Sequence, residues 1–426
     1  MEKFLHHIWQ HRLLPKGALA TIDGEPVEVL DPGLLNTDAG PDFFNAKVRI
    51  ADRVWAGNVE IHVRASDWMR HGHHTDPAYD SVVLHVVAQS DARVTRTDGT
   101  PIPQMVMGGV EELNERHRAL ASAPATALPC VDVISSIPGI YITDWLTSLA
   151  FERLHAKVDR VLGLFERVEG DWRSVVYVVL ARALGFSTNS DAFERLALSV
   201  PLRALMHHQG SPVSVEALLF GHAGMLSGAR SGSPEEAYMN ILRQEHAFLA
   251  TKYGLGQPRT LGWRMARMRP QSFPHRRVAL LAAMVSGGFL IGQTIFTVSN
   301  VDEARALFRV PVSKFWQEHF TFAPSEGFAG GVLSGSTMDS LIINVVAPVI
   351  YAFGERHGRP EMQERAADIL SSLAPERNSI VRGFTDAGIP CPDALTSQAL
   401  IQLRRAYCEP RKCLYCRIGH RCLTRR

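Results

Sequence analysis

The stretch GPDFFNAKVRIADRVWAGNVEIHVRASDW, residues 40–68, decides the expected fold of the first part of the chain. Two runs rich in Val, Ile and Phe flank ADR, which is typical of a hairpin turn, so the stretch predicts two adjacent strands. Side chains alternate between the faces of a strand, which places Glu60, His62 and Arg64 on one face and the apolar residues between them on the other. Asp42 opens the preceding strand, directly after a Gly-Pro turn. The pairing therefore predicts that Asp42 and Glu60 converge at one end of the sheet.

Two interpretations of this polar face are open. Carboxylate oxygens are the ligands that Mg²⁺ and Mn²⁺ prefer, so Asp42 and Glu60 are candidate ligands of a hard metal ion. The other interpretation is that the same residues form the solvated face of an ordinary sheet. A histidine also interrupts the apolar run VVLHVV at His85, which makes His85 a possible accessory residue.

The residues around this stretch indicate a mixed fold. Strand-like runs continue through the first 110 or so residues, after a short amphipathic helix at the start of the chain. From about residue 140 the apolar residues recur at helical spacing. The expected fold class is α+β. We predict a mainly β-sheet domain over 1–118, a linker over 119–139, a large all-α domain over 140–403 and a basic, cysteine-rich tail over 404–426 that forms a four-cysteine metal knot.

Composition restricts the class of protein. The chain has 426 residues, of which 46% are hydrophobic, and its formal net charge is only +2, so it is not a polyelectrolyte. No secretory signal is recognisable at the N-terminus, and the longest apolar run, which begins at Val278, is shorter than a membrane span requires. We expect a cytoplasmic protein without a membrane partner, and the oligomeric state stays open.

The cysteines are concentrated at the end of the chain. Four of the six follow the spacing C-x4-C-x2-C-x5-C, while Cys130 and Cys391 stand apart in the sequence. Cysteines stay reduced in the cytoplasm, and closely spaced thiolates usually bind a metal there. The pattern predicts either Zn²⁺ or a [4Fe-4S] cluster held by the four cysteines, with His420 as a possible substitute ligand. The four ligands are Cys408, Cys413, Cys416 and Cys422.

Arginines gather in two places within this nearly neutral chain. Guanidinium groups bind phosphate bidentately, and aromatic residues can stack on single-stranded bases, so both places are candidate nucleic-acid contacts. The alternative is that these arginines pair with acidic side chains of neighbouring helices. The candidates are Arg264, Arg267, Arg269, Arg276 and Arg277 in WRMARMRPQSFPHRR, and Arg411, Lys412 and Arg417 beside the cysteines.

The pair of motifs Pro41-Asp42 and Glu60-Ile61-His62 resembles the PD-(D/E)XK nuclease superfamily. The resemblance implies a nuclease-like fold for the domain over 1–118. It also implies a catalytic site made of Asp42, Glu60 and His62, with Mg²⁺ or Mn²⁺ on the carboxylates and on the carbonyl of Ile61. The metal would polarise a phosphodiester and generate hydroxide from bound water. His62 stands where the family has lysine, and histidine can also act as a general base. An acidic residue from an earlier element often completes such sites, for which Glu2 and Glu28 are candidates.

The last three cysteines resemble the iron–sulfur staple of some PD-(D/E)XK exonucleases, and in part the cluster loop of helix-hairpin-helix DNA glycosylases. In the exonucleases the fourth cysteine lies far upstream, whereas Cys408 is local in this chain. This departure leaves zinc as an alternative to iron and sulfur.

A longer pattern resembles a bacterial family of uncharacterised proteins, and that resemblance implies no activity. It includes GPDF, GNVEIHV and HGHHTDPAYDSVVLHVV, followed much later by RPQSFPHRR. Within it, His71, His73, His74 and Asp76 are similar to the HxHxDH signature of binuclear zinc hydrolases, but their order differs. His73 is therefore a second accessory candidate, and a turn that caps the following strand explains the same residues without a metal.

Three functional hypotheses follow. The first is a metal-dependent nuclease, or a degenerate relative of one, that acts on nucleic-acid phosphodiesters. The second is a non-catalytic nucleic-acid-binding protein with a structural metal site. The third is a zinc-dependent hydrolase of a small phosphorylated substrate. The sequence leaves open whether the site is active, whether DNA or RNA is bound, and whether cleavage starts at an end.

Overall fold

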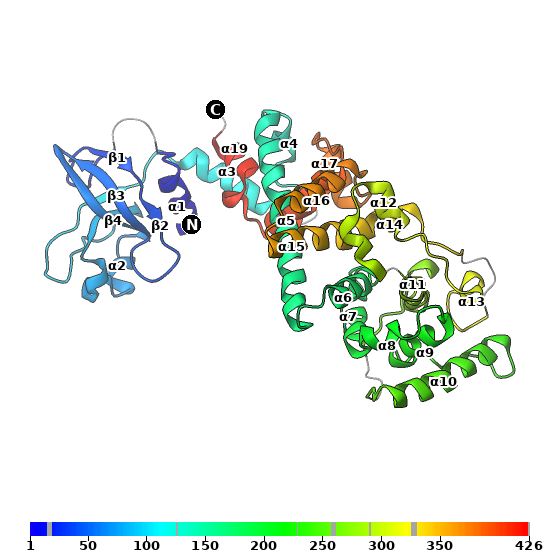
Figure 1. The fold of residues 1–426 in the computed structure, drawn as a ribbon. Helices are drawn as coiled ribbons and strands as arrows, with labels where there is room; N and C mark the ends of the chain where they lie inside the picture. The colour runs from blue at the N-terminus through cyan, green and yellow to red at the C-terminus, as the bar shows by residue number, and fades with distance from the viewer. Residues whose placement is uncertain are drawn as a thin grey trace. The chain divides into compact units, whose positions relative to one another are not determined.

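The computed structural model describes residues 1–14, 19–124, 127–227, 229–256, 261–288, 291–324 and 330–424. The chain forms two compact units. The first contains Met1–Trp145 together with two returning segments, Gly383–Ile389 and Leu403–Arg426, and the second contains Leu146–Arg382 and Pro390–Gln402. The first unit holds the sheet and the second is helical, so the predicted mixed α+β class is confirmed (Figure 1).

The sheet of the first unit is small and mixed. Its main path runs β1-β3-β4-β5-β6, and the short β2 pairs with β3 outside this path. The pairs β1–β3 and β3–β4 are antiparallel, whereas β4–β5 and β5–β6 are parallel. The strands are β1 (Val27–Asp31), β2 (Leu34–Leu35), β3 (Phe43–Ile50), β4 (Arg53–Arg64), β5 (Val82–Gln89) and β6 (Gln104–Val106).

The hairpin turn lies where the sequence predicts it. β3 ends at Ile50 and β4 begins at Arg53, and Ala51 between them adopts a left-handed φ of 49°. At the other end of the hairpin Phe43 pairs with Val59, and an irregularity in the register follows Phe43. Asp42 thus enters the sheet beside the Glu60 segment of β4, which is the convergence that the alternation predicts.

A short irregular crossover joins the parallel strands β4 and β5. It contains α2 (Asp67–Arg70) and two 3₁₀ turns, η1 (His73–Thr75) and η2 (Pro77–Tyr79). In the parallel register Glu60 pairs with His85. Because directly paired residues share a face, His85 lies on the polar face of β4.

Helix α1 (Glu2–Gln10) covers the apolar face of this sheet. Phe4, Leu5, Ile8 and Trp9 are buried and belong to the same core cluster as Ile61. Burying a side chain of this size stabilises a fold by about 1.5–3 kcal/mol, so α1 is held to the sheet largely by apolar burial.

The first unit also contains helices that the sequence assigned to the linker and the tail. The boundary at residue 118 falls inside a helix, and the expected linker includes another short one. Helices α3 and α19 contact each other. These elements are α3 (Glu111–Ser122), α4 (Val131–Ile134), a π-helical turn η6 (Leu403–Cys408), η7 (Cys413–Tyr415) and α19 (Arg417–Thr424).

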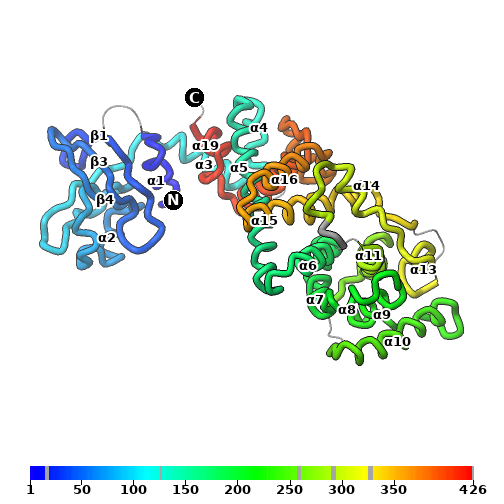
Figure 2. Tube along the Cα trace, in the orientation of Figure 1, coloured from blue at the N-terminus to red at the C-terminus, as the bar shows by residue number. Residues whose placement is uncertain are grey.

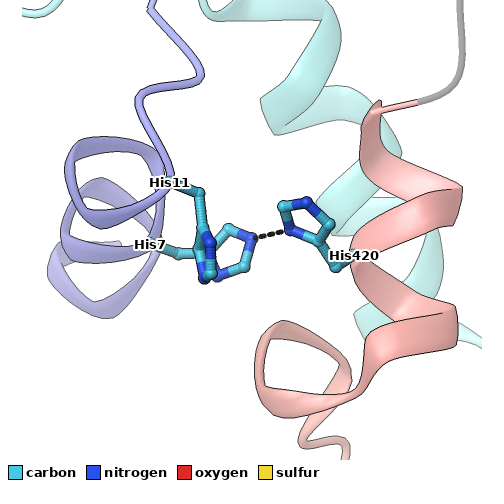
Figure 3. Close-up of side chains that lie close together, drawn as sticks. All are labelled: His7, His11 and His420. Carbon is cyan, nitrogen blue, oxygen red and sulfur yellow. Dashed lines mark hydrogen bonds between the residues drawn. The ribbon is translucent and has the colours of Figure 1, made fainter. Parts of the chain in front are cut away.

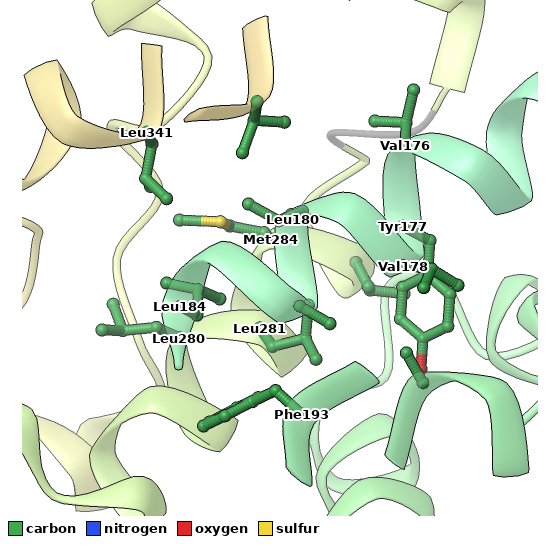
Figure 4. Packing of buried hydrophobic residues seen from close by; sticks show 14 of the residues in the cluster. Val176, Tyr177, Val178, Leu180, Leu184, Phe193, Leu280, Leu281, Met284 and Leu341 are labelled. Atoms are coloured by element: carbon green, nitrogen blue, oxygen red, sulfur yellow. The ribbon is translucent and has the colours of Figure 1, made fainter. Parts of the chain in front are cut away.

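The second unit is helical throughout its described part, and the tube in Figure 2 follows its path. Its core includes Tyr177, Phe193 and Met284, which pack together with neighbouring aliphatic residues (Figure 4). Helices α5 (Gly139–Arg167) and α17 (Ser379–Asp386) pass from one unit to the other. The remaining helices are α6 (Trp172–Leu184), α7 (Ser190–Ser199), α8 (Leu202–Met206), α9 (Pro212–His222), α10 (Pro234–Lys252), η3 (Pro270–Ser272), α11 (Pro274–Ser286), η4 (Ile291–Thr297), α12 (Val301–Ala306), α13 (Lys314–Glu318), α14 (Gly335–Leu341), the π-helical η5 (Ile342–Val346), α15 (Ala347–His357), α16 (Pro360–Ser372) and α18 (Ala394–Gln402).

One helical run among the described residues, Gly335–His357, is long and apolar enough to cross a membrane by length and composition. Of its apolar window 72% is buried inside the protein, which is also typical of a core helix, so the run is weak support for a membrane span. The apolar run that begins at Val278 lies in part in α11, where Val278 and its neighbours through Val285 are buried.

Candidate functional site

Asp42 and Glu60 meet at the end of the β3–β4 hairpin. The backbone N–H of Asp42 donates to Glu60 Oε2 at 3.0 Å, and the backbone N–H of Ile61 donates to Asp42 Oδ2 at 2.8 Å. Glu60 is only 5% exposed. Burial raises the pKa of Glu60, and the nearby Asp42 carboxylate adds to this rise. A bound cation would offset both effects, so the two carboxylates form a site that favours a positive charge.

Two histidines lie beside the second oxygen of Glu60, and a third histidine contacts one of them. His62 Nε2 lies 3.5 Å and His73 Nε2 lies 3.4 Å from Glu60 Oε1. His71 Nδ1 lies 3.2 Å from His62 Nε2. One ring nitrogen from each of His62, His71 and His73 lies within 4.8 Å of the others, a spacing that one metal ion can bridge. His62 and His73 are buried, whereas His71 is exposed.

His85 orients His62 from the neighbouring strand. Its Nε2 lies 2.9 Å from His62 Nδ1, and the side chain is fully buried. When His62 donates its Nδ1–H to His85, the lone pair of His62 is on Nε2. That nitrogen lies next to Glu60 Oε1 and His71 Nδ1. Such a second hydrogen bond is how proteins usually fix the tautomer of a metal-ligating histidine.

The local chain geometry explains how His71 and His73 reach the sheet. Gly72 between them has a φ of +80°, which glycine adopts without a steric penalty. Trp68 is fully buried and contacts the ring of His73 edge-on and the ring of His85 at a tilt. Tyr79 stacks on His73 with ring centroids 3.7 Å apart.

Sequence reasoning missed His6 and Tyr79. His6 Nε2 on α1 lies 3.2 Å from Asp42 Oδ2. Burial alone would lower the pKa of His6, but the Asp42 carboxylate raises it overall. Burial, aided by Glu60, raises the pKa of Tyr79 to about 12. The apolar residues at helical spacing predicted the helix that carries His6, but no local sequence pattern indicates that His6 contacts Asp42. Glu28, one of the acidic candidates, instead pairs with Arg49 and is exposed.

Low pH should destabilise the metal-free protein because of its buried histidines. Burial, with some help from neighbouring histidines, lowers the pKa of His7, His62 and His85 to about 3. As the pH falls below about 6.5, the unfolded chain binds protons that the folded chain does not. We therefore expect the free energy of unfolding to fall by about 1.4 kcal/mol per pH unit for each of the three between about pH 6 and pH 4. Urea unfolding at a series of pH values measures this slope.

The matched variants for this experiment are His85→Gln and His207→Gln. His85 is buried, so its replacement should make the dependence of the unfolding free energy on pH shallower by the contribution of one histidine, about 1.4 kcal/mol per pH unit. His207 is exposed, so its replacement should leave the slope unchanged. A slope that is the same in all three proteins would contradict this account.

The tail cysteines are buried, and Cys130 lies among them. The Cys130 thiol hydrogen bonds with Cys422, which, together with burial, raises its pKa. Cys130 stands apart from the other four in the sequence, and it joins them only because the tail folds back onto the first unit. Burial raises the pKa of Cys408 to about 12 and that of Cys416 to about 11. Cys391 belongs to the second unit and does not take part. The buried set is Cys130, Cys408, Cys413, Cys416 and Cys422.

The basic residues beside the cysteines have different environments. Arg411 donates to the backbone oxygens of Ala123 and Pro124, so its guanidinium ties two segments of the first unit together. Arg417 is exposed and pairs with Asp144. Lys412 is exposed. Of the three residues assigned to nucleic acid here, Lys412 and Arg417 are therefore the accessible ones.

In the second unit Arg264, Arg267 and Arg269 line a cavity of about 650 Å³. Arg276 and Arg277 are 1% and 6% exposed. The Arg276 guanidinium donates to the backbone oxygens of Trp316 and Gly330, whereas Arg277 lies over the ring of Phe186. Such buried positions favour a structural role for Arg276 and Arg277 over contact with a phosphate backbone.

Replacing Arg276 with methionine should destabilise the protein without weakening nucleic-acid binding. The variant keeps the apolar stem but leaves the two carbonyl oxygens without this donor, which we expect to cost about 2–4 kcal/mol. Urea unfolding measures the loss of stability. The control is Arg269→Met, which changes an exposed position and should leave the free energy of unfolding unchanged. A stable Arg276→Met protein with weakened nucleic-acid binding would restore Arg276 as a phosphate contact.

Comparison with known proteins identifies the family but no activity. The family described as "Protein of unknown function (DUF2851)" matches residues 2–379, a range that includes the whole Asp42–Glu60 site and Cys130. No curated protein and no solved structure matches the chain. The match covers most of the 426 residues. The chain therefore belongs to the DUF2851 family of proteins of unknown function.

Proposed function

We propose that this protein is a metal-dependent phosphodiesterase of nucleic acids, with a nuclease-like site in its first unit. The observation that carries the proposal is the position of Glu60 Oε1, 3.5 Å from His62 Nε2 and 3.4 Å from His73 Nε2. A carboxylate oxygen and imidazole nitrogens at such distances can be drawn together by one divalent ion. The proposed ligands are Glu60, His62, His71 and His73, with Asp42 beside them.

The order of the elements supports the nuclease-like part of this proposal. Asp42 directly precedes β3, and Glu60 and His62 lie on β4, the next strand. This is the arrangement that the resemblance to the PD-(D/E)XK superfamily implies. The hydrogen bond from Ile61 N–H to Asp42 Oδ2 fixes that carboxylate against the second motif.

The chemistry of the ligands suggests which ion binds. Imidazole suits Mn²⁺ and Zn²⁺ better than Mg²⁺, which prefers oxygen ligands and retained water. We therefore favour Mn²⁺ or Zn²⁺ at this site. When bound, such an ion would lower the pKa of a coordinated water and polarise a phosphoryl oxygen.

The side chains around the ligands have their own roles in the proposal. His62 acts as a ligand instead of as the general base that its place in the motif first suggested. His6 holds Asp42 Oδ2 at 3.2 Å, and its raised pKa favours an imidazolium that can donate a proton to a leaving oxygen. Tyr79 and Trp68 restrict His73 by ring contacts and so keep its Nε2 near Glu60.

The cysteines supply a structural cofactor in this proposal. Cys130 stands far upstream of Cys413, Cys416 and Cys422, which is the distribution of ligands in the exonucleases that the tail resembles. For this reason we favour a [4Fe-4S] cluster over zinc. To bind a metal these thiols must release their protons to solvent, and because the ion binds the cysteine set that the fold assembles, an occupied site would stabilise the folded tail.

Nucleic acid is the favoured substrate because exposed basic residues lie on the same unit as the ligands. Lys412 and Arg417 are exposed there, and a phosphate backbone would gain from both charges. The cavity that Arg264, Arg267 and Arg269 line provides further positive charge in the second unit.

A cleavage assay with the purified full chain tests the proposal. Single- and double-stranded DNA, RNA and a small phosphodiester such as bis(p-nitrophenyl) phosphate are each incubated with Mg²⁺, Mn²⁺ or Zn²⁺. We expect cleavage of a nucleic acid with Mn²⁺ or Zn²⁺, and its loss in a chelator. Cleavage of small phosphoesters alone would favour the zinc-dependent hydrolase, which the histidine-rich ligands also suit. Salt-sensitive binding without any cleavage would leave the non-catalytic nucleic-acid-binding protein.

A further inference from the structure

We infer that His7, His11 and His420 form a separate binding site for a divalent transition metal, suited to Zn²⁺. One ring nitrogen from each of the three lies within 4.8 Å of the others. Figure 3 shows the three rings gathered between α1, which carries His7, and α19, which carries His420. None of these residues belongs to the Asp42–Glu60 site or to the cysteine set.

The spacing of the histidines suits a tetrahedral ion. His7 and His11 are four residues apart at the end of α1, so they lie on one side of the helix, with ring centroids 4.4 Å apart. His420 Nδ1 lies 3.1 Å from His7 Nε2. Two nitrogens that ligate Zn²⁺ at 2.0–2.1 Å in tetrahedral geometry are about 3.3 Å apart. An ion can therefore replace the His7–His420 hydrogen bond with little movement of either ring.

The triad borders a cavity, which leaves room for a fourth ligand. The cavity has a volume of about 460 Å³ and is lined by all three histidines. Three protein ligands with an open position are typical of zinc sites that bind a water or a substrate, in contrast to closed structural sites. Lys3, Arg417 and Arg421 line the same cavity, against one acidic residue, Asp144. This excess of positive charge favours an oxyanion, such as phosphate, as the fourth ligand.

The proposed site does not depend on the proposed nuclease activity. His6, next to His7 on α1, contacts Asp42, whereas His7 contacts His420. The two histidine groups therefore use different residues, and each can be removed without deleting a ligand of the other. His420 lies between Cys416 and Cys422 in sequence, so the experiment uses substitutions on α1 and leaves the tail intact.

Cobalt titration of the full chain tests the inference. Purified protein that retains any cysteine-bound metal is dialysed against a mild chelator and titrated with Co²⁺, while absorption and bound metal are recorded. His11 is exposed, so its replacement should be tolerated by the fold. We expect His11→Ala to raise the Kd of one of the bound Co²⁺ ions by at least about 10-fold. The double variant His7→Ala/His11→Ala should lose that equivalent altogether.

The reciprocal variant His71→Ala/His73→Ala separates the two histidine sites. It should keep the equivalent that depends on His7 and His11, and it should abolish any cleavage activity. Gln10→Ala, which removes another side chain that lines the cavity, is the matched control and should bind Co²⁺ like the wild type. The lost equivalent should show ligand-field absorption of nitrogen-bound Co²⁺ without a thiolate charge-transfer band.

Two outcomes would overturn the inference. One is a His7→Ala/His11→Ala protein that is folded by circular dichroism and binds as much Co²⁺ as the wild type. The other is a His11→Ala protein with unchanged affinity and spectrum. Inorganic phosphate should change the cobalt spectrum of the wild type but not that of the double variant, and an unchanged wild-type spectrum would refute the oxyanion as fourth ligand. A wild-type protein that cleaves no substrate but still binds the Co²⁺ ion that depends on His7 and His11 would refute the nuclease proposal alone.

Discussion

Glu60→Gln should abolish metal-dependent cleavage while the protein stays folded. The amide has nearly the same shape as the carboxylate, but it removes the negative charge that lies within 3.5 Å of both His62 and His73. Since this charge would hold the ion, we expect the rate to fall by on the order of 10³-fold, which corresponds to about 4 kcal/mol of lost transition-state stabilisation. Single-turnover cleavage of the preferred nucleic acid measures the effect.

The stability of the metal-free protein provides an independent readout. Burial raises the pKa of Glu60, so the neutral amide should leave the free energy of unfolding unchanged or higher in the absence of metal. In the wild type added Mn²⁺ or Zn²⁺ should raise the melting temperature, and Glu60→Gln should lose most of that rise. Glu28→Gln, on the same sheet but exposed and paired with Arg49, should behave like the wild type. Full activity in Glu60→Gln would remove Glu60 from the mechanism.

Cys416→Ser should release the tail metal and destabilise the first unit. The side chain is 7% exposed and lies in the buried cysteine set, so a serine there replaces a ligand and leaves a polar group in an apolar environment. We expect the metal content to fall to background and the melting temperature to drop by on the order of 10 °C. Iron, zinc and sulfide analysis of anaerobically purified protein, with its absorption spectrum, measures the first effect.

Comparison of single cysteine variants identifies the ligands. If Cys130 is a ligand, Cys130→Ser should lose the metal as completely as Cys416→Ser, whereas Cys408→Ser should retain it. Cys391→Ser, in the other unit, is the control and should retain the metal. About four irons and an absorption shoulder near 400 nm would support the cluster. One zinc without colour would make the site a zinc knot, and no metal in the wild type would refute both assignments.

Gly419→Ala tests how tightly the tail is packed around this site. A Cβ at Gly419 would lie 2.2 Å from the carbonyl oxygen of Cys413, which is backbone and cannot rotate away. The substitution should therefore disturb the cysteine set as Cys416→Ser does, although it removes no ligand. Gly163→Ala is the matched control, because a Cβ there meets no atom within 4 Å.

The sequence by itself determined the local features of this protein. The alternation of residues 40–68 and the turn after Ile50 predicted the β3–β4 hairpin, because both depend only on neighbouring residues. Since a register shift of one residue would move every side chain to the other face, the buried Val59 and Ile61 also fixed the face of Glu60. The meeting of Asp42 with Glu60 followed from the same local pairing.

Only the tertiary structure decided which distant residues join these groups. The crossover between parallel strands brings His73 to Glu60 and His71 to His62, and its irregular turns have no period from which the sequence could predict this. His6 reaches Asp42, and Cys130 reaches the tail cysteines, through packing between segments far apart in the chain. Packing likewise buried Arg276, although its neighbours Arg267 and Arg269 are exposed. The local pattern predicts which face of a strand or helix is buried. The long-range burial of apolar side chains determines which distant residues pack against that face.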